Sequence, residues 1–224
     1  MAKSRLIRTI CVFVILSAGA EVTLGAEQLA SESQPTREPP LISNATSIWE
    51  AGVGEGFRPG IQTVGLSTGA GLGVAVFGGS QQHDLALMSL TYGRFIGGIK
   101  GVDHWYRGNW EWRAEIFGGA EFSPSKEWVI GFTPHLRYNF ATSTRWVPFV
   151  DGGAGVSGTG IGHPDLSNTF EFNLQASTGV QWFVKDNFAV TFEARWLHLS
   201  DAGITSPNLG VNTIMGMVGL SWFF

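Results

Sequence analysis

The sequence predicts an all-β protein, an eight-stranded antiparallel transmembrane β-barrel of the outer membrane. Three observations lead to this prediction: a composition rich in glycine and aromatics, an exported N-terminus, and a two-residue period of apolar side chains. Of the 224 residues, 31 are glycine, 12% are aromatic and 14% are charged, where about 25% charged is usual. This composition excludes a disordered chain. The net charge of -4 and the lack of a basic stripe argue against a nucleic-acid partner.

The N-terminus has the features of a secretory signal peptide. Three basic residues precede an apolar run at 10–20, which is too short for a transmembrane helix of about 20 residues. We therefore expect residues 1–26 to be a signal peptide cleaved after Ala20 or Ala26, with a short N-terminal anchor as the alternative. The single cysteine, Cys11, lies in this segment, so the mature protein is expected to have no thiol and no disulfide.

The rest of the chain divides into two parts. Residues 27–46 contain three prolines and are expected to form a flexible lead-in, and residues 47–224 are expected to form the barrel domain. No stretch after the signal peptide is apolar for 18 residues. An exported chain of this kind can enter the bacterial outer membrane only as a closed barrel, because every backbone polar group must be paired in lipid.

Side chains beyond residue 47 alternate between apolar and polar. Between 109 and 122, large apolar residues such as Trp110 and Ile116 share one strand face, and Glu111, Arg113 and Glu115 share the other. A soluble sandwich also alternates. Aromatic residues at strand ends, charged polar faces and segments near the about 9 to 11 residues of a tilted transmembrane strand favour the barrel. The C-terminal Phe224 is also typical of such barrels.

We expect eight strands, joined by short periplasmic turns and longer external loops. The expected strands are 47–57, 84–97, 109–122, 127–141, 146–156, 169–184, 188–200 and 212–224. A further candidate at 71–77 is assigned to the first long loop or to an extension of strand one. The segment 98–108 is longer than a periplasmic turn needs to be, and the pattern does not explain it.

Most charged residues on the polar strand faces are expected to pair inside the barrel. These residues are Glu111, Arg113, Glu115, Glu121, His135, Arg137, Glu171, Glu193 and Arg195. His83 and Asp84 begin a strand, where a capping role or a contact with lipid headgroups is expected. The scattered glycines suit curvature and close packing in a small barrel.

Three polar residues share the parity of the apolar, lipid-facing side chains: His198, Ser200 and Asn212. A polar group on a lipid face is costly and calls for a function. Because residues two apart share a strand face, His198 can take the proton of the Ser200 hydroxyl, and a group on the next strand can hold the other ring nitrogen. The alternative is that all three are rim residues that contact headgroups and water.

The C-terminal pattern resembles a known family. His198-Leu-Ser200-Asp201-Ala-Gly, followed by Pro-Asn208-Leu-Gly-Val-Asn212, is similar to the signature of the outer-membrane lipid A 3-O-deacylases (the PagL family). The resemblance implies an eight-stranded barrel that hydrolyses the ester-linked acyl chain at position 3 of lipid A, without cofactor or metal. It implies Ser200 as nucleophile, His198 as general base and Asn208 as an oxyanion donor. The implied partner is lipid A, or lipopolysaccharide, in the outer leaflet.

The chain departs from the family pattern at two positions. The best-known members have an acid at the position of Asn212 and an asparagine at the position of Asp201. Either the site is slow, or Asp201 supplies the missing charge, or the site is inactive. Two other functions stay open: a non-catalytic structural or surface-binding barrel, and an esterase acting on another envelope lipid. A homodimer is one candidate for the assembly.

Overall fold

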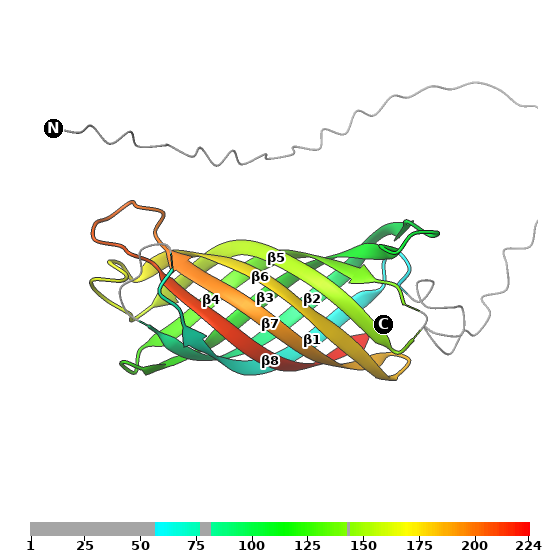
Figure 1. The fold of residues 1–224 in the computed structure, drawn as a ribbon, viewed down its shortest axis with the longest axis horizontal. Coiled ribbons are helices and arrows are strands. Elements are labelled where there is room, and N and C mark those ends of the chain that lie inside the picture. The colour runs from blue at the N-terminus through cyan, green and yellow to red at the C-terminus, as the bar shows by residue number, and fades with distance from the viewer. Residues whose placement is uncertain (1–56, 77–81, 143) are drawn as a thin grey trace, which may run out of the picture. The chain divides into compact units, whose positions relative to one another are not determined.

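The computed structural model describes residues 57–76, 82–142 and 144–224. In this part of the chain, eight antiparallel strands form a closed barrel (Figure 1). They are β1 (Gln62–Gly73), β2 (Asp84–Lys100), β3 (Gly108–Ser123), β4 (Trp128–Phe140), β5 (Trp146–Thr159), β6 (Phe170–Lys185), β7 (Phe188–Ser200) and β8 (Val211–Phe223). No helix among the described residues is long and apolar enough to cross a membrane.

Each strand pairs with its sequence neighbours, and β1 closes the barrel by pairing with β8 from Thr63↔Phe223 to Gly73↔Thr213. Eight strands in antiparallel order confirm the predicted fold class. Within each strand, exposed and buried side chains alternate as expected. Large apolar side chains such as Ile116 on β3 and Val218 on β8 are exposed on the outer wall, and their neighbours in the same strand are buried in the interior.

The first strand differs from the prediction. We expected it at 47–57, but β1 runs from Gln62 to Gly73, and residues 47–56 lie outside the described part of the chain. The sequence pattern does not reveal β1, because glycine occupies much of its inward face and leaves few polar side chains to alternate with the apolar ones. Packing explains these glycines: a Cβ at Gly69 would collide with the carbonyl of Gly216, and a Cβ at Gly71 would lie 2.5 Å from the carbonyl of Ile214.

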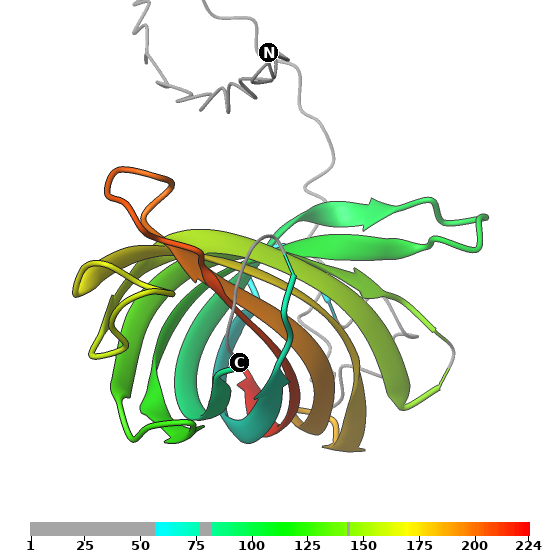
Figure 2. The ribbon, with the colours of Figure 1, turned by 60° about the vertical axis from the view of Figure 1, so that its left-hand side comes forward.

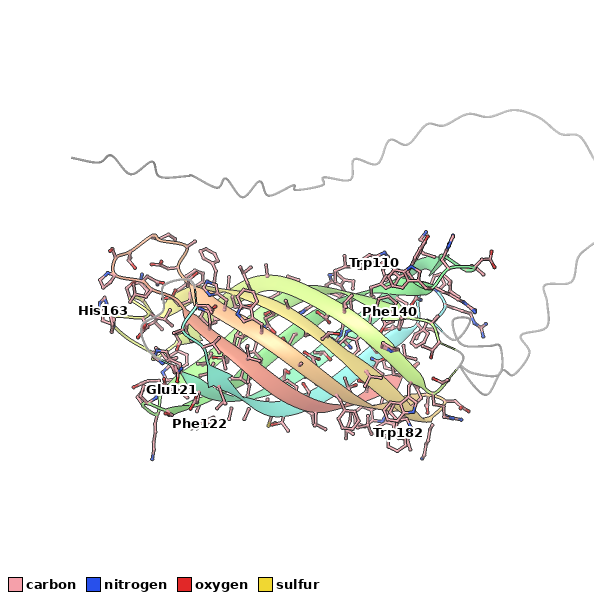
Figure 3. The ribbon with its side chains drawn as sticks, in the orientation of Figure 1. Trp110, Glu121, Phe122, Phe140, His163 and Trp182 are labelled. Atoms are coloured by element: carbon pink, nitrogen blue, oxygen red, sulfur yellow. The ribbon has the colours of Figure 1, made fainter. Side chains whose placement is uncertain are left out.

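The two ends of the barrel differ as predicted. One end, here called the turn end, has the short connections 141–145 and 186–187, and the other, the loop end, has the longer 160–169 and 201–210. In outer-membrane barrels the short turns face the periplasm. Figure 3 shows Trp110, Phe140 and Trp182 at the turn end and His163 at the loop end.

The interior is filled by side chains in three zones. Leu85, Phe117, Leu166 and Met215 belong to an apolar cluster toward the loop end, and Phe57 belongs to a second one at the turn end. A charged network lies between them, and its ion pairs confirm the predicted interior pairing. Its short contacts are Arg195–Glu115 at 2.7 Å, Arg195–Glu193 at 2.7 Å, Arg137–Asp151 at 2.8 Å, Arg113–Asp151 at 3.0 Å and His135–Glu115 at 3.1 Å.

One member of the predicted charge-pairing set behaves differently. Glu171 is fully buried, but its carboxylate accepts hydrogen bonds from amide groups, namely the side chain of Asn208 and the backbone of Asn168. This carboxylate lies where β6 begins, beside the long loops, so loop amides rather than arginines reach it. The prediction of charge pairing is therefore wrong for Glu171.

Candidate active site

Two neighbouring strands bring the three lipid-facing polar residues together at the loop end. His198 and Ser200 are the last outward-facing residues of β7, and His198 lies directly opposite Asn212 on β8 in the strand register. Pairing through that register places residues 14 apart in the sequence side by side. The alternation in the sequence predicted this outward orientation, and the pairing of β7 with β8 brings His198 and Asn212 into contact.

His198 lies between the other two groups. Its Nε2 is 3.0 Å from Oγ of Ser200, and its Nδ1 is 2.9 Å from Oδ1 of Asn212. The ring also stacks on Trp196, with centroids 5.8 Å apart and planes inclined by 18°. These contacts hold the imidazole in one orientation, with one nitrogen toward the hydroxyl and the other toward the amide.

The amide of Asn212 selects the histidine tautomer. Its Nδ2 donates to the backbone carbonyl of Val76 at 3.0 Å. A carbonyl only accepts, so the NH₂ group must face Val76 and the amide oxygen must face His198. Nδ1 therefore carries the proton, and the unprotonated Nε2 faces the Ser200 hydroxyl. This is the tautomer in which a histidine serves as base to a serine.

Asp201 directs its carboxylate into the connection that follows β7. It accepts hydrogen bonds from the backbone of Gly203 at 2.9 Å and from the backbone of Thr205 at 2.8 Å, as well as from the Thr205 hydroxyl. Burial by itself would raise the pKa of the Asp201 carboxyl, but these hydrogen bonds outweigh it and hold the pKa below its usual value. The carboxylate thus organises the turn.

Asn208 directs its amide toward the barrel interior. Its Nδ2 lies 3.1 Å and 3.2 Å from the two carboxylate oxygens of Glu171. An amide engaged in this way is not pointing at Ser200. The structure therefore brings together His198, Ser200 and Asn212 of the predicted site residues, and it gives Asp201 and Asn208 other partners.

The sequence pattern does not predict the groups that hold the β7–β8 connection in place beside the site. The carbonyl of Asp165 accepts the backbone N–H groups of Leu209 and Gly210, at 3.0 Å and 2.9 Å. Asp165 is itself 3.3 Å from Nε2 of His83, whose Nδ1 contacts Glu121. His83 is buried, so the expected headgroup contact is wrong for it. No spacing signal links these residues, because His83, Asp165 and Gly210 lie in three different connections and Glu121 lies in β3.

The site has the parts of an acyl-transfer centre. It offers a hydroxyl, a base oriented toward it, and a neutral amide that fixes the base, all on the outer wall near the level of the loops. Among the described residues, no group of three or more histidine, cysteine or acidic side chains is placed to hold a metal ion. Fold and site together define a membrane β-barrel with a serine–histidine pair facing lipid.

The sequence model of the family described as Lipid A 3-O-deacylase (PagL) matches residues 91–221, more than half of the chain. The chain belongs to this family, whose members are outer-membrane β-barrel enzymes that deacylate lipid A. The matched residues include β7, most of β8 and the whole His198–Ser200–Asn212 arrangement. No curated protein sequence matches the chain significantly.

Three solved structures are similar to the chain to different degrees. Neisserial surface protein A (NspA) has a TM-score of 0.52 at 12% identity, over 73% of this chain and 97% of its own, a likeness of fold. The outer membrane enzyme PagL has a TM-score of 0.49 at 19% identity, over 70% of this chain and 97% of its own. Ail, the attachment invasion locus protein of Yersinia pestis, has a TM-score of 0.28 at 11% identity, over 75% of this chain and 100% of its own.

Proposed function

We propose that this protein hydrolyses the ester-linked acyl chain at position 3 of lipid A, with Ser200 as nucleophile and His198 as general base. The observation that carries this proposal is the 3.0 Å contact between Ser200 Oγ and His198 Nε2 on the lipid-facing wall. A soluble esterase would bury such a pair in a cleft. Here the pair meets its substrate by lateral diffusion of lipid in the outer leaflet.

The reaction has two steps that balance in atoms and protons. Ser200 Oγ attacks the ester carbonyl carbon while its proton moves to Nε2 of His198. The sugar oxygen then leaves and takes that proton, which leaves the acyl chain on Ser200. In the second step, a water deprotonated by the same nitrogen attacks the acyl carbon. The bond to Ser200 Oγ then breaks, His198 returns the proton to that oxygen, and the fatty acid leaves. We include Asn212 in this proposal as the residue that orients His198.

Asn208 is the proposed oxyanion donor, on the family resemblance. To act in this way, its amide must turn from Glu171 toward the carbonyl oxygen of the bound ester. The sequence offered Asp201 as a candidate charge partner of the site. We propose instead that it shapes the β7–β8 connection beside the site, because its carboxylate accepts hydrogen bonds from Gly203 and Thr205. Residues 1–26 are proposed as the signal peptide that directs export to the outer membrane.

Mass spectrometry of lipid A from cells that express the protein tests the proposal. The wild type should remove one 3-linked acyl chain, and Ser200→Ala should leave lipid A intact. Ser89→Ala is a matched control, because its hydroxyl pairs with Ser67 inside the barrel, 2.8 Å away. Identical spectra for the wild type and Ser200→Ala, with both barrels folded, would rule out deacylation of lipid A by Ser200. A structural or surface-binding barrel, or an esterase acting on another envelope lipid, would then be favoured.

A further inference from the structure

The connection between β2 and β3 is unlike the other described connections of the turn end. Both strands continue past the body of the barrel, β2 to Lys100 and β3 from Gly108, with a register irregularity between Ile96 and Lys100. In Figure 2 this green hairpin leaves the barrel wall sideways instead of continuing along the barrel. The segment that was too long for a simple turn is therefore a projecting hairpin with its tip at 101–107.

The tip is a built structure with its own hydrogen bonds. The backbone N–H of His104 donates to the carbonyl of Gly101 at 2.9 Å, and that of Arg107 donates to the carbonyl of His104 at 3.0 Å. The Tyr138 hydroxyl on β4 donates to the carbonyl of Tyr106 at 2.6 Å. These bonds hold the backbone of the tip in a defined turn and tie it to β4.

What the tip displays is apolar and aromatic. Trp105 is 87% exposed and Val102 is 60% exposed. The rings of His104 and Tyr106 stack with centroids 5.0 Å apart, and the Trp105 ring meets Tyr106 edge-on at 5.7 Å. A contiguous group of exposed apolar and aromatic side chains on one hairpin tip marks a surface with a partner.

The other described connections of the turn end have polar tips. The β4–β5 connection carries Thr142, Thr144 and Arg145, and the β6–β7 connection carries Asp186 and Asn187. These turns are suited to water. The aromatic tip is thus a local feature of the β2–β3 hairpin and not a general property of this end of the barrel.

The hairpin continues a surface that already contacts lipid. Trp110, the first large outward residue of β3, packs on Tyr138 with ring centroids 4.8 Å apart, and Trp146 stacks on Trp182 at 5.4 Å farther round the same end. Aromatic girdles of this kind lie where acyl chains meet headgroups. The hairpin leaves the wall at the level of Trp110.

The charges of the hairpin suit phosphate groups. Lys100 and Arg107 flank the tip and Asp103 is its acid, so the hairpin carries a net positive charge. Amphipathic rings combined with cations are the side chains that bind the interfacial region of a bilayer, since the rings enter among the upper acyl carbons and the cations contact phosphate.

We propose that the β2–β3 hairpin is a lateral membrane anchor, which inserts Trp105 and Val102 into the headgroup boundary of the periplasmic leaflet. Its partner is the phospholipid of that leaflet. The anchor attaches the barrel to the membrane on one side only. It therefore sets the rotation and tilt of the barrel in the membrane, and with them the orientation of the loop end in the outer leaflet. This proposal does not depend on the proposed esterase activity.

A fluorescent probe on a single cysteine tests the anchor. Cys11 is the only native cysteine, so Cys11→Ser combined with Trp105→Cys gives one labelling site in the full chain. The labelled barrel is placed in nanodiscs of phosphatidylethanolamine and phosphatidylglycerol, which leave both faces open to solvent. Lipid carrying a nitroxide near the headgroup and aqueous iodide are then added separately. The matched control carries the probe at Lys185→Cys, exposed at the end of β6.

The probe at 105 should lose most of its fluorescence to the nitroxide lipid and little to iodide, and the probe at 185 should show the reverse. If Trp105→Cys fails to fold, Val102→Cys carries the same probe and the same expectation. Equal iodide quenching at 105 and 185 would overturn the proposal. A probe at 105 that is shielded from iodide only after isolated peptidoglycan is added would also overturn it, and would assign the aromatic tip to glycan.

Discussion

Gly210 lies against the imidazole ring of His198. A Cβ at Gly210 would stand 2.9 Å from Cε1 of that ring, and the backbone of Gly210 has a φ of +80°. The β7–β8 connection therefore returns to the barrel by passing over the base of the proposed catalytic pair. The positive φ and the close approach both require glycine here.

Gly210→Ala should lower kcat by about 10²-fold, because a displacement of the base by about 1 Å is enough for such a loss. Gly203→Ala is the matched control: its φ is +81°, but a Cβ there meets nothing within 4 Å. Both substitutions should cost about 1–2 kcal/mol of backbone strain. Deacylation kinetics and unfolding in urea measure the two effects, and an equal kcat for the two variants would contradict the prediction.

Asn212 supplies orientation without charge, and two substitutions separate these roles. Asn212→Ala should lower kcat by about 10²-fold, because it removes the amide oxygen that accepts the proton of Nδ1 of His198. Asn212→Asp should raise kcat by about tenfold, equivalent to about 1.4 kcal/mol of stabilisation of the imidazolium. The same change should lower the stability of the barrel, because a carboxylate oxygen would then face the carbonyl of Val76. A drop in kcat for Asn212→Asp would show that charge is not what the site lacks.

Asn208 can act as oxyanion donor or merely satisfy the buried Glu171. If Asn208 is the oxyanion donor, Asn208→Ala should lower kcat by about 10²–10³-fold. The double variant Glu171→Gln with Asn208→Ala separates the roles, because it removes the buried carboxylate that the Asn208 amide satisfies. It should recover stability while kcat stays low. Recovery of kcat along with stability would assign Asn208 to structure alone.

The β7–β8 connection should loosen in acid. The hydrogen bonds from Thr205 and Gly203 hold the pKa of Asp201 below its usual value. A carboxyl with a lowered pKa in the folded state contributes stability above its unfolded pKa, about 3.9, and loses it as the pH falls through the folded pKa.

Hydrogen exchange of the amides of 201–210 measures this effect. Protection should fall below about pH 4 in the wild type, and Asp201→Asn should remove that dependence on pH. Asp103→Asn, which changes an exposed acid at the opposite end of the barrel, should leave it unchanged. The same acid-induced loss of protection in Asp201→Asn as in the wild type would contradict the assignment.

Removing one partner from the charged interior should destabilise the barrel strongly. Arg137 is almost fully buried, contacts Asp151 at 2.8 Å and Glu193 at 3.4 Å, and lies 3.6 Å above the Phe149 ring. Arg137→Ala leaves buried carboxylates short of a partner and should cost about 3–5 kcal/mol. The control Arg145→Ala breaks an exposed pair with Asp186 and should cost about 1 kcal/mol or less. Equal unfolding midpoints in urea for the two variants would contradict this prediction.

The sequence by itself determined the barrel and the face on which the site lies. Alternation is a local property, since successive side chains of a strand point to opposite sides whatever the partner strand is. The parity of His198, Ser200 and Asn212 was therefore enough to place all three on the outer wall. Pairing of the interior charges followed from the same alternation. The alternation failed for β1, where glycines on the inward face remove the polar half of the pattern.

Only the tertiary structure decided which groups meet. The Val76 carbonyl that orients the Asn212 amide lies 136 residues away in sequence, and the Glu171 that engages Asn208 lies on β6. The tie between Asp165 and the backbone of Gly210 joins two separate connections. Closure of the barrel brings these segments together, and hydrogen bonds between loops depend on where a chain returns in space. That is why residue spacing predicted the serine–histidine pair but not the partners of Asp201 and Asn208.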